Sequence, residues 1–190
     1  HKLVNINSDK LNILSLINNK IYELLEKTNV NLIEKIIIAN IINEDTIDVC
    51  ILFNHIAKEI GLKQKYILFR STKHINFDAK SIVFNILDIE LIDNTLSNNY
   101  LNKLNIDINK YDKILFKYGK IILNFNNISH DIFSKILHND YKSLIDINFI
   151  FDFKLIMTDY LPIHMENLIG LVMKKIFYNS IQFIYSLNKL

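Results

Sequence analysis

Apolar residues recur at steps of three and four along much of this 190-residue chain, which is the spacing of one face of an amphipathic α-helix. The first such stretch begins after Ser8, a residue suited to cap a helix N-terminus, and ends near Thr28. Its apolar positions are Leu11, Leu14, Ile17, Ile21, Leu24 and Leu25. The pattern predicts a helix over residues 8–28.

The same spacing predicts six further helices, over residues 32–42, 47–60, 82–91, 109–125, 129–137 and 163–187. Each begins with a residue that favours a helix N-terminus, in chain order Asn31, Asp45 or Thr46, Asp78, Asn109, Ser129 and Pro162. Glu34 follows Asn31 at the spacing of a capping box, and Gly61 lies where the second of these helices would end.

Two segments carry a mixed signal. Residues 65–69 (KYILF) are short and aromatic, which suits a strand as well as a helix. Residues 144–157 combine helical spacing with the strand-like alternation of Ile145, Ile147, Phe149, Phe151 and Phe153. We interpret both segments as helical, with minor β structure around 65–69 or 145–153 as the alternative.

These elements together predict an all-α fold, built as a bundle or an irregular helical repeat. A length of 190 residues fits one domain over 1–190 and can bury roughly two-thirds of the surface of the unfolded chain. The Asn-rich segment 94–109 reads as a loop with a short helical turn, and it is the best place for a boundary between sub-domains.

The last predicted helix has apolar residues on more than one face. A helix of this kind is either central to its own fold or partly covered by another chain. We therefore expect a partner-binding surface on it, with candidate residues Leu168, Val172, Ile176, Phe177, Ile181 and Ile184. Lys174 and Lys175 lie in the middle of its longest apolar run, so we expect no membrane span.

Two groups of basic residues suggest anion binding. Lys110, Lys113, Lys117 and Lys120 would share one face of the helix predicted over 109–125, as a phosphate-binding or solvated surface. A second cluster interleaves basic residues with Tyr66 and Phe69, in the manner of sites that bind nucleic-acid backbones and stack on bases. Its basic members are Lys58, Lys63, Lys65, Arg70, Lys73 and Lys80.

No motif nominates a catalytic, cofactor or metal site. The chain has only three glycines, whereas phosphate loops and nucleophile elbows depend on glycine. The histidines lack the i, i+4 spacing of a helical zinc site. Two acidic groups, Glu44/Asp45/Asp48 and Asp88/Glu90/Asp93, read more simply as a charged helix N-terminus and a solvated surface. We therefore expect no enzyme activity, cofactor or metal.

Composition adds two limits. The 37 isoleucines, 26 asparagines and 21 lysines beside one arginine indicate an AT-rich genome, because those residues have A- and T-rich codons. A single cysteine, Cys50, excludes an internal disulfide and fits a reducing intracellular compartment: cytosol, nucleus or the interior of an organelle. The net charge of +2 offers no global field toward nucleic acid or membrane.

The leading hypothesis is a non-enzymatic helical interaction domain, a structural or adaptor subunit with other protein subunits as partners. The alternative is a helical nucleic-acid-associated protein that uses the Lys110, Lys113, Lys117 and Lys120 face. An enzyme with dispersed catalytic residues is the third hypothesis, and a pocket with perturbed titratable groups would support it.

Overall fold

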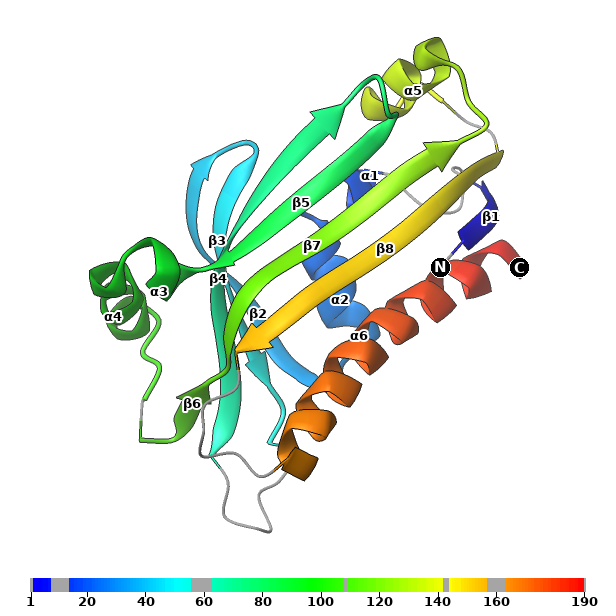
Figure 1. The fold of residues 1–190 in the computed structure, drawn as a ribbon. Coiled ribbons are helices and arrows are strands. Elements are labelled where there is room, and N and C mark those ends of the chain that lie inside the picture. The colour runs from blue at the N-terminus through cyan, green and yellow to red at the C-terminus, as the bar shows by residue number, and fades with distance from the viewer. Residues whose placement is uncertain are drawn as a thin grey trace.

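A long antiparallel β-sheet forms the framework of the chain (Figure 1). The computed structural model describes residues 2–7, 14–55, 63–107, 109–141, 144–156 and 163–189. The sheet has the strand order β1-β8-β7-β5-β4-β3-β2, and the short strand β6 pairs in parallel with β4. All other neighbours in the sheet are antiparallel.

The strands are β1 (Lys2–Asn7), β2 (Ile33–Asn43), β3 (Thr46–Phe53), β4 (Gln64–Asn76), β5 (Ser81–Asp88), β6 (Tyr111–Lys113), β7 (Leu115–Asn126) and β8 (Leu144–Ile156). The helices are α1 (Leu14–Ile17), α2 (Ile21–Thr28), α3 (Ile89–Ile92), α4 (Asn94–Lys103), α5 (His130–Leu137) and α6 (Ile163–Lys189).

Each face of the sheet carries a hydrophobic core, and the smaller one covers its face only at β2, β3 and β4. On one face, residues such as Val49 and Phe69 pack with α2 and α6 in the larger core. On the other face, Cys50 and Leu68 pack with Tyr100 and the rest of the α3–α4 segment in the smaller core. A strand buried on both sides reads as a continuous apolar run, as in β3, where every residue from Ile47 to Phe53 is buried.

The expectation of an all-α fold is wrong, because most of the predicted helices are strands. Of the helix predicted over 32–42, residues 33–42 lie in β2. Residues 47–53 of the next lie in β3, and 65–69 belong to β4. Residues 82–88 lie in β5, 111–125 lie in β6 and β7, and 144–156 form β8. Stiff β-branched isoleucine favours these strands once both faces of the sheet can bury it.

Two predicted helices are present. The Ser129 hydroxyl accepts a hydrogen bond from the backbone N–H of Ile132 at 3.2 Å and caps α5, and α6 begins at Ile163 as expected. The helix expected over 8–28 forms only as α1 and α2, and residues 8–13 lie outside the described residues. The expected loop at 94–109 is mainly the helix α4.

A buried side chain fixes the middle of α6 to α2. The amide of Asn29, directly after α2, donates hydrogen bonds to the carbonyl of Ile176 at 3.0 Å and to the hydroxyl of Ser180 at 3.2 Å. The Asn179 amide donates in turn to the Asn29 side-chain oxygen at 3.0 Å. The part of α6 before Ile176 lies beyond this attachment and runs beside β8 (Figure 1).

The described residues contain no helix that combines the length and the apolar character needed to cross a membrane.

Candidate functional site

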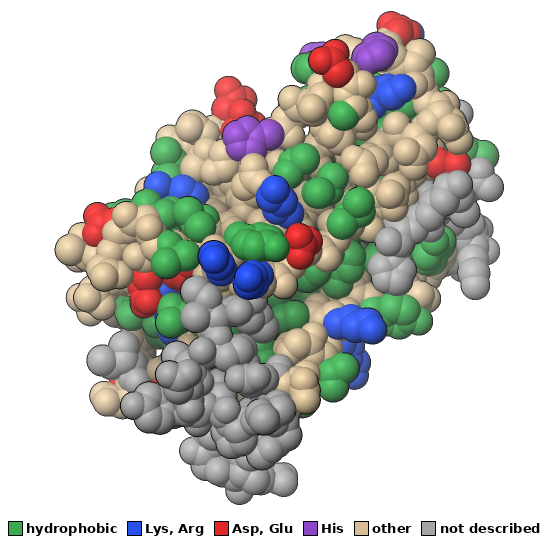
Figure 2. Space-filling view, in the orientation of Figure 1, with side chains coloured by type: hydrophobic (Ala, Val, Ile, Leu, Met, Phe, Trp, Pro, Cys, Tyr) green, Lys and Arg blue, Asp and Glu red, His purple; other side chains and the backbone are tan. Residues whose placement is uncertain are grey.

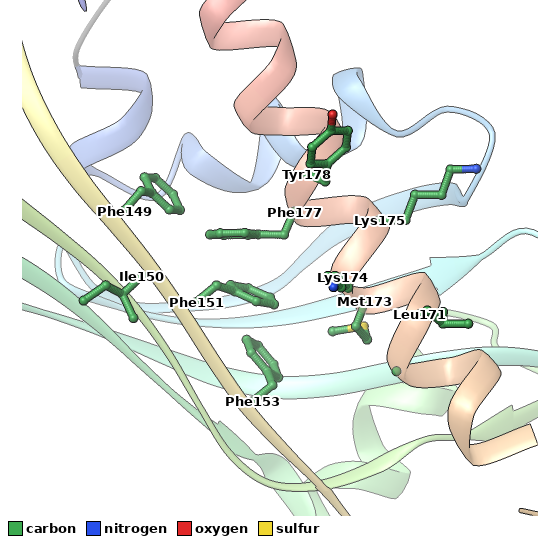
Figure 3. Close-up of a pocket in the computed structure, with 11 residues that line it drawn as sticks. Phe149, Ile150, Phe151, Phe153, Leu171, Met173, Lys174, Lys175, Phe177 and Tyr178 are labelled. Atoms are coloured by element: carbon green, nitrogen blue, oxygen red, sulfur yellow. The ribbon is translucent and has the colours of Figure 1, made fainter. Parts of the chain in front are cut away.

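A groove lined mainly by apolar side chains lies along the border between β8 and α6 (Figure 3). We call it the aromatic groove; its volume is about 860 Å³. Its walls are formed by Phe149, Ile150, Phe151 and Phe153 from β8 and by Gly170, Leu171, Met173, Lys174, Lys175, Phe177 and Tyr178 from α6.

The aromatic groove is open because β1 covers only the beginning of β8. Lys2–Asn7 pair with β8 between Leu144 and Asn148. From Ile150 to Ile156, no described strand pairs with β8 on the side away from β7. This part of β8 is therefore an edge of the sheet among the described strands, and it borders the groove and α6.

Alternation along β8 places three phenylalanines on the face toward α6. The rings of Phe151 and Phe177 are stacked, with centroids 4.0 Å apart and planes inclined by 25°. Phe153 stacks on Phe151 at 4.4 Å, and Phe149 lies 4.9 Å from Phe177. These contacts join strand and helix into one aromatic wall, which fixes the ring positions in the groove.

The space behind this wall, between the sheet and α6, is filled. The cavity there has a volume of only about 20 Å³, with Tyr22, Phe69, Phe153 and Met173 among its lining residues. That volume holds about one water molecule. Phe116 bridges Phe69 and Phe153, with ring centroids 6.0 Å and 5.9 Å away. Of these two spaces lined by described residues, only the aromatic groove has room for a ligand.

The α6 side of the groove combines a missing side chain with positive charge. A Cβ atom added to Gly170 would meet nothing within 4 Å, so the glycine leaves that part of the groove empty. Lys174 follows one helical turn later, and Lys174 and Lys175 are both exposed. The described lining contains no Asp, Glu, His or Cys. The groove therefore offers an apolar wall beside unopposed ammonium groups.

The four lysines predicted to share a helix face do not do so. Lys113 lies on β6 and is nearly buried, with its ammonium nitrogen 2.5 Å from Asp88 and 3.0 Å from Glu90. Lys110 precedes β6. Lys117 lies at the β-bulge between Phe116 and Tyr118 of β7, and Lys120 follows on the same strand. No common anion-binding surface results.

The second basic cluster is dispersed by ion pairs. Arg70 binds the buried carboxylate of Asp48 through two hydrogen bonds of 2.7 and 2.9 Å. Lys63 and Lys65 pair with Asp112, and Lys73 pairs with Asp45. Tyr66 and Phe69 are buried in opposite cores, Lys80 lies between β4 and β5, and Lys58 lies outside the described residues.

The residues proposed for partner binding face the protein's own core. Ile176, Phe177, Ile181 and Ile184 are buried against the sheet and α2, and Leu168 and Val172 are half-buried. They belong to the intramolecular surface of α6. Phe177 alone among them also lines the aromatic groove.

Neither metal ligands nor a reactive nucleophile emerges from the described residues. They contain no group of three His, Cys, Asp or Glu side chains suited to a metal ion. Burial raises the pKa of the Cys50 thiol from 9.0 to about 12, against a smaller opposing effect of Lys113. A thiol with a raised pKa stays protonated at neutral pH and is a poor nucleophile.

No family model matches the sequence, and no curated protein sequence matches it. Among solved structures, human STARD10 superposes with a TM-score of 0.51 at 7% identity, over 99% of this chain and 64% of that chain. Ara h 8.0201 gives 0.47 at 11% identity over 98% and 95%, and ginseng major latex-like protein 151 from Panax ginseng gives 0.44 at 7% over 100% and 95%. The similarity to STARD10 concerns the fold alone, an antiparallel sheet that packs on a long C-terminal helix.

Both leading hypotheses from the sequence are therefore wrong. A helical interaction domain and a helical nucleic-acid-binding face each require a helix bundle, whereas the chain has a sheet that packs on one long helix. The residues that define the groove, above all Phe149, Phe151 and Phe153, were visible in the sequence as an alternating run. Only the contact of β8 with α6 shows that the run borders a groove.

Proposed function

We propose that this chain binds an apolar small molecule in the aromatic groove and acts by binding rather than by catalysis. The observation that carries the proposal is the open space of about 860 Å³ beside the stacked rings of Phe151, Phe153 and Phe177. Small-molecule sites are commonly apolar clefts of about 300–1,000 Å³ with a few polar groups. Apolar area that a ligand buries there favours binding by about 25 cal/mol per Å² before the costs of association.

The chemistry of the walls supports binding without reaction. General acid–base or nucleophilic catalysis uses carboxylate, imidazole, thiol or activated hydroxyl groups within reach of the substrate. Of the described lining residues, only Tyr178 carries a hydroxyl, and the two lysines carry the other polar groups. The expectations of protein partners and of a reducing compartment stay predictions.

The test is a calorimetric titration of the purified chain with dodecanol, which measures the affinity directly. Gly170→Leu should weaken the binding, because its side chain occupies part of the groove without a backbone clash. Gly170→Ala is the matched control: it adds one methyl group, leaves most of the groove open and should still bind. Both variants should be at least as stable as the natural chain, because glycine disfavours a helix by about 1 kcal/mol relative to alanine.

A binding isotherm that Gly170→Leu leaves unchanged would place the ligand elsewhere. Absence of binding to any apolar compound would refute the proposed function itself. A folded Gly170→Leu variant, checked by circular dichroism and urea unfolding, makes either outcome interpretable.

A further inference from the structure

We infer that the ligand of the aromatic groove is an amphiphile with a negatively charged head, and that Lys174 binds this head at the groove. This inference deepens the proposed function and rests on it. It follows from the distribution of charge around the groove, from the direction of the two lysines and from the aromatic wall between them and β8.

The charge at the groove is unbalanced. Lys174 and Lys175 are the only charged residues among the described side chains of α6, residues 167–187, and both line the groove. Some other lysines have carboxylate partners, such as Lys65 with Asp112 and Lys135 with Asp131. Neither groove lysine forms an ion pair with another described residue.

The charged residues of β8 do not offset this charge. Asp152 and Lys154 alternate with the groove phenylalanines, so they point to the opposite face of the sheet. Asp152 is there the cross-strand neighbour of Lys120 on β7. Among the described residues, the face of β8 toward the groove is therefore apolar, and the charge of the groove comes from the lysines of α6.

Lys174 is the better placed of the two lysines. It lies one turn after Gly170 and about one turn before Phe177 and Tyr178, all of which line the groove. In Figure 3 the side chain of Lys175 extends away from the phenylalanines of β8. The Lys174 ammonium group lies beside Met173, on the side of α6 toward these phenylalanines in this view. The control is Lys120 on β7, which carries the same charge on the opposite face of the sheet, beside Asp152.

An apolar tail and an anionic head satisfy both parts of this site. The tail buries its surface against Phe151, Phe153 and Phe177, and the head pairs with Lys174 at the exposed border of the groove. A bound tail excludes water from one side of the ion pair, which strengthens the attraction. A cationic head would meet like charge without a compensating carboxylate in the described lining.

The experiment compares dodecanoate, dodecanol and dodecyltrimethylammonium, which share a tail and differ in head charge, each below its micelle concentration. The titrations are run at about pH 8, where the carboxyl group of dodecanoate is ionised. Dodecanoate should bind about fivefold more tightly than dodecanol, as expected for one partly exposed ion pair. The cationic compound should bind most weakly.

Lys174→Gln should bring the affinity for dodecanoate down to that for dodecanol and leave dodecanol binding unchanged. Lys120→Gln, which removes the same charge on the opposite face of the sheet, should retain the preference for dodecanoate. Equal affinity of the natural chain for dodecanoate and dodecanol, or a preference that survives in Lys174→Gln, would overturn the inference while the proposed function stands. Failure of all three compounds to bind would overturn both.

Discussion

The ring of Phe153 on β8 lies directly against Gly119, its cross-strand partner on β7. A Cβ atom at position 119 would lie 2.6 to 2.9 Å from three carbon atoms of this ring. The absent side chain at Gly119 thus gives Phe153 its place between the core ring of Phe116 and the groove ring of Phe151. Gly119 on β7 therefore determines the position of a ring that lines the groove on β8.

We therefore expect Gly119→Ala to move the Phe153 ring toward the aromatic groove. Overpacking of this kind costs about 1–3 kcal/mol of the free energy of unfolding, and the displaced ring would also lower the affinity for dodecanol. Urea unfolding and calorimetric titration measure the two effects. Gly170→Ala is the matched control, because a methyl group there meets no neighbour and should stabilise the helix. Equal stability of the two variants would contradict this account.

The contact between α4 and the sheet depends on a buried carboxylate. Asp48 on β3 is fully buried, and it binds Arg70 on the neighbouring strand as well as the hydroxyl of Tyr100 on α4, which donates at 2.7 Å. Asp48→Ala leaves the Arg70 charge without its partner and should lower the free energy of unfolding by about 3 kcal/mol. Tyr100→Phe removes only one hydrogen bond and should cost about 1 kcal/mol.

Asp45 provides the comparison for Asp48, because it also pairs with a basic residue of β4, namely Lys73, but is half exposed. Exposed ion pairs contribute at most about 1 kcal/mol, so Asp45→Ala should be nearly neutral in urea unfolding. A loss as large as that of Asp48→Ala would show that burial does not distinguish the two pairs.

The attachment of α6 to α2 gives a third prediction. Asn29→Ala removes the hydrogen bonds to the Ile176 carbonyl and the Ser180 hydroxyl in a buried place, and should lower the free energy of unfolding by about 2–3 kcal/mol. Hydrogen exchange of the amides around residues 176–180 should accelerate more than exchange in β5. Asn54, whose amide donates to the Val30 carbonyl at an exposed site, is the control, and Asn54→Ala should have little effect.

The sequence predicts the helices α5 and α6 better than the strands that precede them. The Ser129 cap and the long helix after Pro162 follow from local signals that hold in any fold. The strand β3 is buried on both faces, and the edge strand β2 carries exposed isoleucines such as Ile41, at 70% exposure. Both effects remove the alternation that identifies a strand, and an isoleucine-rich composition then produces helical spacing by chance.

The candidate site was harder still to infer, because it depends on contacts between distant parts of the chain. The alternation of Phe149, Phe151 and Phe153 was present in the sequence, and a strand interpretation would have placed the three rings on one face. Nothing local indicates that β1 stops pairing at Asn148 or that Phe177 stacks on Phe151. The groove is a property of how β1, β8 and α6 meet.

The buried thiol of Cys50 predicts a loss of stability in alkaline solution. Burial raises its pKa to about 12, whereas the ordinary value is 9.0. Above pH 9.0 the unfolded chain releases this proton while the folded chain retains it, so the folded state binds more protons and the free energy of unfolding falls. The stabilising contribution is complete below pH 9.0 and disappears as the pH rises toward about 12.

One such group lowers the free energy of unfolding by at most about 1.4 kcal/mol per pH unit, and by about 1 kcal/mol between about pH 9 and pH 10. Urea unfolding across this interval measures the slope, and Cys50→Ala should remove most of it even though the variant starts less stable. Burial also raises the pKa of Tyr22 and Tyr66, whose ordinary value is 10.0, so their effect begins later and persists in the variant. An unchanged slope in Cys50→Ala would assign the alkaline loss to the tyrosines and not to the thiol.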